Sequence, residues 1–299
     1  MSMSPAEWAS LRAEFKPGEP RQLFPLVRRI TAGNAGPMTG PGTNCYLIGK
    51  REVAIIDPGP DNAQHIQSII NGSPGPIRWI LVTHTHPDHA PGCHRLSELT
   101  GAPVYAHPAI PKGPARVPGF RADQPLNDGD TIETDEFTLR ALHTPGHASN
   151  HLCFLLDQEA LLIAGDQVMD GSTVVIAPPD GDMRAYLASL ERLMGENIQH
   201  IAPGHGRILD DAQSVLQRII DHRLVRQDKI LIALAETPGE MTIPEIVTRA
   251  YTDVPRFLHP VAELSVHAHL LKLMDEKRVA ATSNATATRE SRWQLIAPR

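Results

Sequence analysis

The sequence has few cysteines, and this excludes several protein classes. Only three occur among 299 residues, at the widely separated positions Cys45, Cys93 and Cys153. No pair has the spacing of a metal knuckle, and the odd number argues against a disulfide framework. We therefore expect free thiols in a reducing compartment, and hence a cytoplasmic protein.

The sequence also lacks long apolar runs and an excess of basic over acidic residues. No stretch approaches the roughly 20 apolar residues that span a bilayer, so we expect no membrane partner. The first residues lack a basic segment followed by an apolar run, and we expect no signal peptide. The net charge of −6 gives no whole-chain case for binding nucleic acid or an anionic membrane.

The chain is long enough for one large domain or two unequal ones. Its 27 prolines and 22 glycines predict many turns and long surface loops. One such loop, over residues 108–119, is rich in both residue types. The sequence leaves open whether this loop is functional or a solvated insertion.

Metal-type side chains gather in one segment. Residues 80–83 predict a short buried strand, and the next six residues read His84-x-His86-x-Asp88-His89. Neutral imidazole and carboxylate are ligands that zinc and similar divalent ions accept. A single histidine at a strand end is usually a satisfied core or surface residue. Four ligand-type residues within six positions instead indicate a metal site.

Three later strand ends carry more residues of this kind. They lie in the segments Thr-Pro-Gly-His147, Ala-Gly-Asp166 and Pro-Gly-His205-Gly. In a layered α/β fold, rigid strands hold the loops at their ends side by side. The sequence therefore predicts one site built from several strand ends.

Periodicity and turn residues predict the other elements. Strands are expected near 23–32, 44–48, 52–57, 104–107, 137–142, 151–156, 160–164 and 198–202, and helices near 91–100 and after the capping residues Asp61 and Asp182. From residue 210 onward the pattern predicts a long helix, a short helix with a capping box at Thr242 and Glu245, a helix over 260–277, and strands over 278–282 and 292–296. This order is the outline of a winged helix.

Three parts are therefore predicted. Residues 1–22 form an N-terminal arm whose helix starts at the capping box Ser4 to Glu7. Residues 23–209 form a catalytic domain. Residues 210–299 form a helical, winged-helix domain.

Taken in order, the motifs resemble those of the metallo-β-lactamase superfamily. The segments that carry the resemblance are Ile-Ile-Asp57-Pro-Gly, His84-x-His86-x-Asp88-His89, Thr-Pro-Gly-His147, Ala-Gly-Asp166 and Pro-Gly-His205-Gly. The resemblance covers roughly residues 23–210. It implies an α/β (α+β) fold, a four-layer αββα sandwich with its site at one edge, followed here by the small winged-helix domain.

The resemblance also implies a site for two divalent ions. His84, His86 and His147 would hold the first ion. Asp88, His89 and His205 would hold the second, and Asp166 would bridge both. Asp57 and His151 would support these ligands from behind, and His151 could also contact a leaving group.

This ligand set predicts an enzyme. Three imidazoles leave a coordination position for water, as in catalytic rather than structural sites. A divalent ion lowers the pKa of that water toward about 7, and a second ion can polarise the scissile bond. Asp88 is the predicted catalytic residue, which orients the water and receives its proton. Zinc (Zn2+) is the expected ion, with manganese and iron as alternatives.

The C-terminal third is similar to that of the lactamase-beta-like group, whose mitochondrial member is a single-strand-specific endoribonuclease. This resemblance implies a metal-dependent hydrolase acting on a small molecule or on single-stranded RNA, the latter at a phosphodiester. One alternative is a thioesterase resembling glyoxalase II, which has the same ligands, and a lactone is a further candidate substrate. Another is a nucleic-acid-binding module with a degenerate metal domain.

The charge of the predicted winged helix argues against strong duplex DNA binding. Lys and Arg barely outnumber Asp and Glu over residues 212–299. A DNA reader would place several cations against phosphates. We therefore expect this region to shape the substrate cleft or to form a homodimer.

Overall fold

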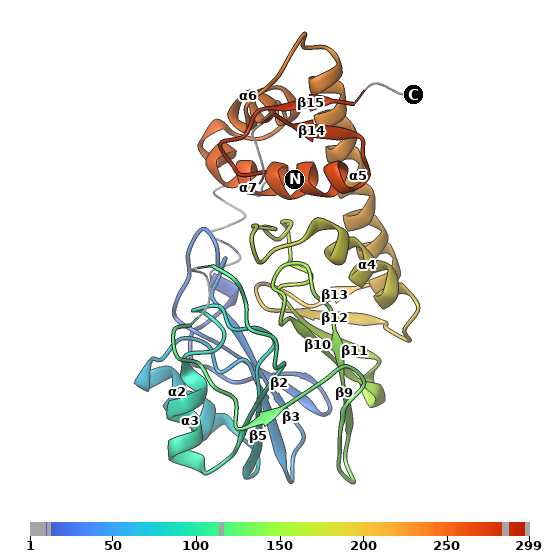
Figure 1. Cartoon of the computed structure of the whole chain (residues 1–299). Helices are drawn as coiled ribbons and strands as arrows, with labels where there is room; N and C mark the ends of the chain where they lie inside the picture. Colours follow the sequence, from blue (N-terminus) through green and yellow to red (C-terminus); the bar gives the residue numbers. More distant parts are fainter. Residues whose placement is uncertain (1–9, 11–12, 114–116, 283–286, 297–299) are drawn as a thin grey trace.

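The computed structural model describes residues 10, 13–113, 117–282 and 287–296 (Figure 1). Figure 1 shows a body that contains both large sheets, with the helices α6 (Ile243–Ala250) and α7 (His259–Asp275) at one end of it and α5 (Ala212–Ala235) running from the body into that end. The predicted capping box from Ser4 to Glu7 lies outside the described residues.

The first sheet contains seven strands in the order β1-β2-β3-β4-β5-β6-β7. Their bounds are Arg21–Phe24, Val27–Thr31, Asn44–Ile48, Val53–Ile56, Ile77–Leu81, Val104–Ala106 and Gln124–Pro125. The strands from β4 to β7 pair in parallel, so the carboxyl ends of β4 and β5 lie at the same edge. The single strand predicted over 23–32 is wrong. A turn that contains Pro25 divides it, because proline has no N–H for the ladder.

The second sheet contains six strands in the order β13-β12-β11-β10-β9-β8. In that order their bounds are Leu209–Asp210, His200–Pro203, Leu161–Gly165, Leu152–Leu156, Thr138–His143 and Thr131–Glu133. The neighbours β11 and β12 are parallel and end at the same edge. The sequence did not predict β7, β8 or β13, and two residues, as in β7 and β13, are too few to show a periodic pattern.

Helices cover the outer face of each sheet. The helices α2 (Ala63–Gly72) and α3 (Gly92–Thr100) share a core with the first sheet. The helices α4 (Met183–Met194) and α5 (Ala212–Ala235) share one with the second. A third core, which includes Tyr46 and Phe154, lies between the two sheets. The predicted four-layer αββα sandwich is thus confirmed.

Helix capping explains where two of these helices begin. Asp182 caps α4 as predicted, because its Oδ1 accepts from the N–H groups of Arg184 and Ala185. The prediction that Asp61 caps α2 is wrong. The cap is Asn62, whose Oδ1 accepts from the N–H of His65, while Asp61 pairs with Arg95.

The C-terminal region adds α6 (Ile243–Ala250), α7 (His259–Asp275), β14 (Val279–Ala281) and β15 (Trp293–Leu295). The capping box of α6 is present as predicted. The core of the C-terminal region includes Ile230 and Leu234 from the second half of α5. Leu216 and Ile219 from the first half of α5 pack instead in the core of the sandwich. The domain boundary after residue 209 stays a prediction. The helix α5 contributes residues to the sandwich core and to the core of the C-terminal region. Of the described helices, none is long and apolar enough to cross a membrane.

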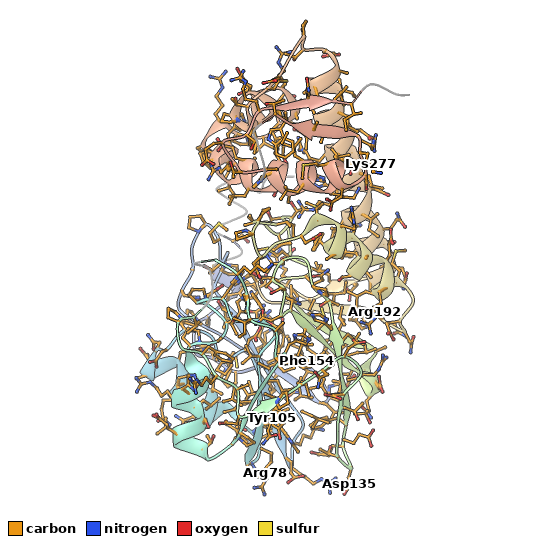
Figure 2. The ribbon with its side chains drawn as sticks, viewed as in Figure 1. Arg78, Tyr105, Asp135, Phe154, Arg192 and Lys277 are labelled. Atoms are coloured by element: carbon orange, nitrogen blue, oxygen red, sulfur yellow. The ribbon has the colours of Figure 1, made fainter. Side chains whose placement is uncertain are left out.

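The core between the sheets yields a first prediction. Phe154 is 1% exposed there (Figure 2), so Phe154→Ala should lower the free energy of unfolding by about 3–5 kcal/mol in a denaturant titration. Leu99→Ala is the control, because Leu99 is 61% exposed and should change stability by no more than about 0.5 kcal/mol. Equal effects of the two changes would contradict this core.

Candidate metal centre

The predicted ligands gather where strands of both sheets end. Asp57 follows β4, and residues 83–89 follow β5. Asp166 follows β11, and His205 comes two residues after β12. Backbone hydrogen bonds join the sheets at this edge, from Asn44 to the Gly204 carbonyl at 2.8 Å and from Leu152 to the Thr83 carbonyl at 2.7 Å.

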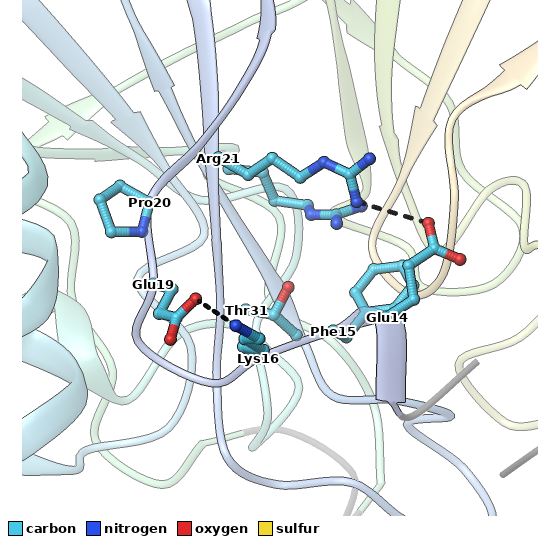
Figure 3. A pocket seen from close by; sticks show the side chains of 8 residues that line it. Glu14, Phe15, Lys16, Glu19, Pro20, Arg21 and Thr31 are labelled. Atoms are coloured by element: carbon cyan, nitrogen blue, oxygen red, sulfur yellow. Dashed lines mark hydrogen bonds and ion pairs between the residues drawn. The ribbon is translucent and has the colours of Figure 1, made fainter. Parts of the chain in front are cut away.

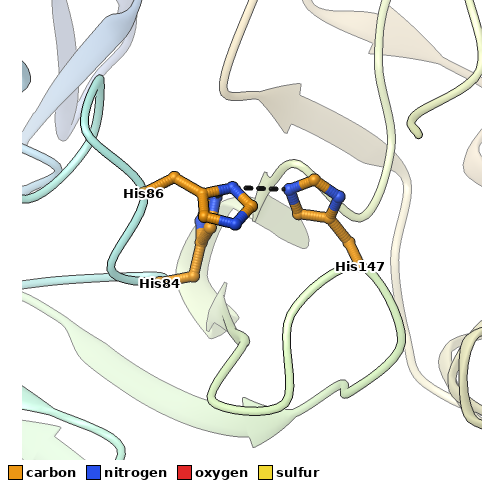
Figure 4. A group of neighbouring side chains, drawn as sticks. All are labelled: His84, His86 and His147. Carbon is orange, nitrogen blue, oxygen red and sulfur yellow. Dashed lines mark hydrogen bonds between the residues drawn. The ribbon is translucent and has the colours of Figure 1, made fainter. Parts of the chain in front are cut away.

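The first group contains three histidines from two loops. The Nδ1 atom of His86 lies 3.0 Å from the Nε2 atom of His84 and 3.0 Å from that of His147. Figure 4 shows the ring of His147 reaching toward His86 from the opposite loop. Three ring nitrogens therefore face one another across the space that one ion would take.

The second group contains Asp88, His89 and His205. The Oδ2 atom of Asp88 lies 3.4 Å from His89 Nε2 and 3.2 Å from His205 Nε2. Asp166 lies between the two groups. Its Oδ1 is 3.4 Å from both of these nitrogens, and its Oδ2 is 3.6 Å from His147 Nε2. The structure thus brings all seven predicted ligands together.

Backbone carbonyls orient two of the histidines from behind. The Nδ1 atom of His147 donates to the Val175 carbonyl at 2.8 Å, and that of His205 donates to the Gly42 carbonyl at 3.2 Å. A carbonyl only accepts, so each Nδ1 carries the proton. In the neutral ring, Nε2 then presents a lone pair to the site.

Asp57 orients two more histidines. It is 2% exposed and accepts from the Thr83 N–H at 2.8 Å, the Thr83 hydroxyl at 2.7 Å and His89 Nδ1 at 2.8 Å. Because the Thr83 hydroxyl donates to Asp57, it accepts from His84 Nδ1, which is 3.0 Å away. One carboxylate therefore directs the Nε2 lone pairs of His84 and His89 inward.

His151 is buried beside this centre. Its Nε2 accepts from the N–H of Asp166 at 3.2 Å, and its Nδ1 is 3.0 Å from the Thr144 hydroxyl. Its ring also stacks on that of His84, with the centroids 5.1 Å apart. Both nitrogens are engaged within the protein. His151 therefore supports Asp166 and His84, and its contact with a leaving group stays a prediction.

The donor atoms fit metal ions. His84 and His147 both point a lone pair at His86 Nδ1, which can carry at most one proton. The buried atoms His89 Nε2, Asp166 Oδ1 and His205 Nε2 have no hydrogen-bond partner among the described residues. Buried polar atoms without a hydrogen-bond partner lower the stability of the fold. A divalent cation can be coordinated by all of these nitrogen and oxygen atoms.

The charges at the site agree with this fit. Burial lowers the pKa of His84 and His147 and holds that of His86 at about 4, so these rings are neutral at pH 7. Burial raises the pKa of Asp88, but the imidazoles of His89 and His205 outweigh it and bring that pKa well below its usual range. Burial lowers the pKa of His89 and His205, but Asp88 and Asp166 outweigh it and raise the pKa of both rings. A divalent ion binds the same nitrogen lone pairs and would release these protons.

One residue that the sequence did not single out holds the loops around the site. The Oδ1 atom of Asp180 accepts from the Lys112 N–H at 2.8 Å and the Ser149 hydroxyl at 2.7 Å, and its Oδ2 accepts from the Ser149 N–H at 2.9 Å. Nearby, the Val117 N–H donates to the carbonyl of Thr85, between two ligands. The described part of loop 108–119 therefore lies against the metal centre.

A pocket of about 250 Å³ lies apart from the ligands (Figure 3). It is lined by Glu14, Phe15, Lys16, Glu19, Pro20, Arg21, Arg29 and Thr31. Its buried Arg29 lies over the Phe15 ring, 4.0 Å from the centroid, and donates to the Gly206 carbonyl at 3.4 Å. None of the lining residues is a ligand, but Arg29 supports the residue after His205.

The stacked sheets and the ligand cluster define a metal-binding hydrolase fold, and comparisons identify the family. The family model described as "Metallo-beta-lactamase superfamily" matches residues 38–205, and the one described as "Beta-lactamase associated winged helix domain" matches residues 242–293. The chain belongs to the metallo-beta-lactamase superfamily. It is a hydrolase of this fold with a His/Asp cluster that can bind metal and a C-terminal winged helix.

Several curated relatives match nearly the whole chain. "Lactamase-like protein vrtG" of Penicillium aethiopicum is 32% identical over 86% of this chain and 84% of its own. "Atrochrysone carboxyl ACP thioesterase" of Aspergillus chevalieri is 31% identical over 93% and 90%. "Beta-lactamase-like protein 2 homolog" of Drosophila melanogaster is 28% identical over 88% and 95%.

Solved structures share the fold. A metallo-beta-lactamase family protein from Thermus thermophilus has a TM-score of 0.74 at 23% identity, covering 92% of this chain and 100% of its own. A beta-lactamase domain protein from Burkholderia ambifaria has a TM-score of 0.77 at 19% identity, covering 99% and 100%. At these identities the likeness concerns the fold alone.

A glycine beside a ligand yields a second prediction. Gly146 has φ +145°, and a Cβ there would lie 2.3 Å from the Cα of Tyr186 in α4. Gly146→Ala should displace His147 and weaken metal binding at least about 10-fold in a chelator competition. Gly101→Ala is the control, because Gly101 has φ +75° with no atom within 4 Å of the added Cβ. Unchanged affinity in Gly146→Ala would contradict the role given to this close approach.

Proposed function

We propose that the chain is a two-metal hydrolase that cleaves a thioester. The observation that carries the two-metal part is the convergence of two three-residue groups joined by Asp166. The thioester part is supported by the relative from Aspergillus chevalieri, which is named an ACP thioesterase and aligns with 93% of this chain.

Each residue has a role in this proposal. His84, His86 and His147 hold the first ion, Asp88, His89 and His205 the second, and Asp166 both. When bound, the ions supply a nucleophilic water at neutral pH and polarise the scissile carbonyl. Zinc is the expected ion because imidazole and carboxylate suit it, with manganese and iron as alternatives.

Asp88 is placed to handle the proton of the attacking water. Its Oδ2 faces His89 and His205, whereas its Oδ1 has no hydrogen bond or ion pair with a described residue. Its side chain is 26% exposed, more than that of Asp166 or His147. One carboxylate oxygen is therefore available to orient water from the open side and receive its proton.

The charges of the C-terminal region favour a thioester over RNA. The described ion pairs of its cations are Arg226 and Lys229 with Asp253, Lys272 and Arg278 with Glu276, Arg289 with Glu263, and Arg292 with Glu240 and Glu245. Cations already paired with carboxylates are poor partners for a phosphate backbone. Single-stranded RNA therefore remains the less supported substrate, and we expect no strong duplex DNA binding.

Location and assembly also belong to this proposal. All three cysteines are buried and unpaired, which suits the cytoplasm that the sequence predicts. The partner that we propose is a small-molecule or carrier-bound acyl thioester. A homodimer through the C-terminal region stays a prediction.

A third prediction tests Asp88. Asp88→Ala should lower kcat at least about 100-fold, the low end for a positioned acid or base. The ion held by the three histidines should stay bound in this variant. Asp135→Ala is the control, because Asp135 is 90% exposed and lies in the turn between β8 and β9 (Figure 2). Near-normal turnover in Asp88→Ala would exclude Asp88 as the group that handles the proton.

A fourth prediction concerns the substrate. Metal-loaded protein should hydrolyse an acyl thioester with kcat/KM at least tenfold above that for single-stranded RNA, a nucleotide phosphodiester, a lactone and a β-lactam. A tenfold preference corresponds to about 1.4 kcal/mol of transition-state binding. Protein treated with a chelator is the control and should lose the activity. Faster cleavage of RNA would overturn the thioester assignment.

A further inference from the structure

We infer that Arg223 of α5 is a positioning residue for the metal centre. It fixes the backbone segment that orients His147, so the helix that leads into the C-terminal region completes the first ligand group. The inference rests on the two-metal site of the proposed function but not on the thioester.

The first connection runs through two adjacent residues. Arg223 is 3% exposed, and its Nη2 donates to the Val174 carbonyl. The next carbonyl, that of Val175, accepts from Nδ1 of His147 at 2.8 Å. A single peptide unit therefore separates the arginine contact from the acceptor that fixes the tautomer and direction of a ligand.

This segment depends on such a contact because it has no regular structure. Between the end of β11 at Gly165 and the start of α4 at Met183, no residue lies in a helix or a strand. Val174 and Ile176 are buried in the core beneath the second sheet, but side-chain packing does not direct a carbonyl. The guanidinium supplies the missing donor.

A second connection leads to Asp166. The guanidinium carbon of Arg223 lies 5.2 Å from the centroid of the Tyr186 ring. The Tyr186 hydroxyl donates at 2.9 Å to the carbonyl of Gln167, the residue after Asp166. Arg223 therefore contacts the supports of two ligands, His147 and Asp166.

Packing alone does not account for an arginine at this position. Arg223 forms no ion pair with a carboxylate of the described residues, and its buried Nε has no hydrogen-bond partner among them. A buried charge with an unmet donor costs stability, whereas an apolar side chain of similar length would pack without that cost. The two contacts at the metal centre give the charge a function.

The same helix offers a matched control. Arg226 lies about one turn further along α5 and is 5% exposed. It donates to the Ala250 carbonyl, pairs with Asp253 and lies 3.8 Å from the centroid of the Tyr251 ring. All of these partners belong to the C-terminal region. Loss of the Arg226 side chain should therefore destabilise that region without displacing the metal ligands.

The experiment compares Arg223→Met with Arg226→Met in the full chain. Zinc affinity is measured by competition with a chromophoric chelator, and amide hydrogen exchange at residues 174–177 is measured on metal-free protein. Arg223→Met should weaken the binding of at least one ion about 10-fold, as for groups behind a ligand, and should speed exchange in this segment. In Arg226→Met, the zinc affinity and the exchange rates at residues 174–177 should stay within about twofold of the wild type.

Two results would overturn the inference: wild-type affinity and exchange in Arg223→Met, or equal losses in both variants. If Arg223→Met does not fold, Arg223→Lys keeps the charge but not the planar donor group. It should still weaken zinc binding several-fold, and wild-type affinity in this variant would also overturn the inference. Neither readout uses a substrate, so a failure of the thioester proposal would be seen separately.

Discussion

The structure depends on one electrostatic constraint at the ends of its strands. Histidine nitrogens and carboxylate oxygens face one another there, and three of these buried atoms have no hydrogen-bond partner among the described residues. Acceptors behind the rings fix this arrangement, because the carbonyls of Val175 and Gly42 and the carboxylate of Asp57 each accept the outer N–H of a histidine. Divalent cations would offset the cost of burying such a cluster, so its geometry fits a metal centre.

The sandwich is what makes this convergence feasible. His84 and His89 come from the first sheet, whereas Asp166 and His205 come from the second. The two sheets must therefore keep a fixed register at this edge. Asn44 maintains it, because its amide donates to the carbonyls of Pro203 at 3.1 Å and Gly206 at 2.9 Å. The C-terminal region is part of the same construction, since α5 packs in its core and in the sandwich core and brings Arg223 to the segment between β11 and α4.

The sequence predicted the ligands better than their supports. His84 to His89 could be identified because their chemistry and spacing are unusual in themselves. The carbonyls of Gly42 and Val175 could not, because every residue has a carbonyl and only the fold decides which one meets a ring nitrogen. Local patterns also failed where two choices are nearly equal, as at Asp61 and Asn62, which are both good caps. The very short strands β7 and β13 form through pairing with neighbours and leave no pattern to detect.

The central claim is that one chain binds two divalent ions. The most direct measurement is metal content by elemental analysis after loading metal-free protein and removing free metal, combined with a calorimetric titration. The account predicts two ions per chain in the wild type and one in His205→Ala, because the three-histidine group does not include His205. A saturated content of one ion or fewer in the wild type would contradict it.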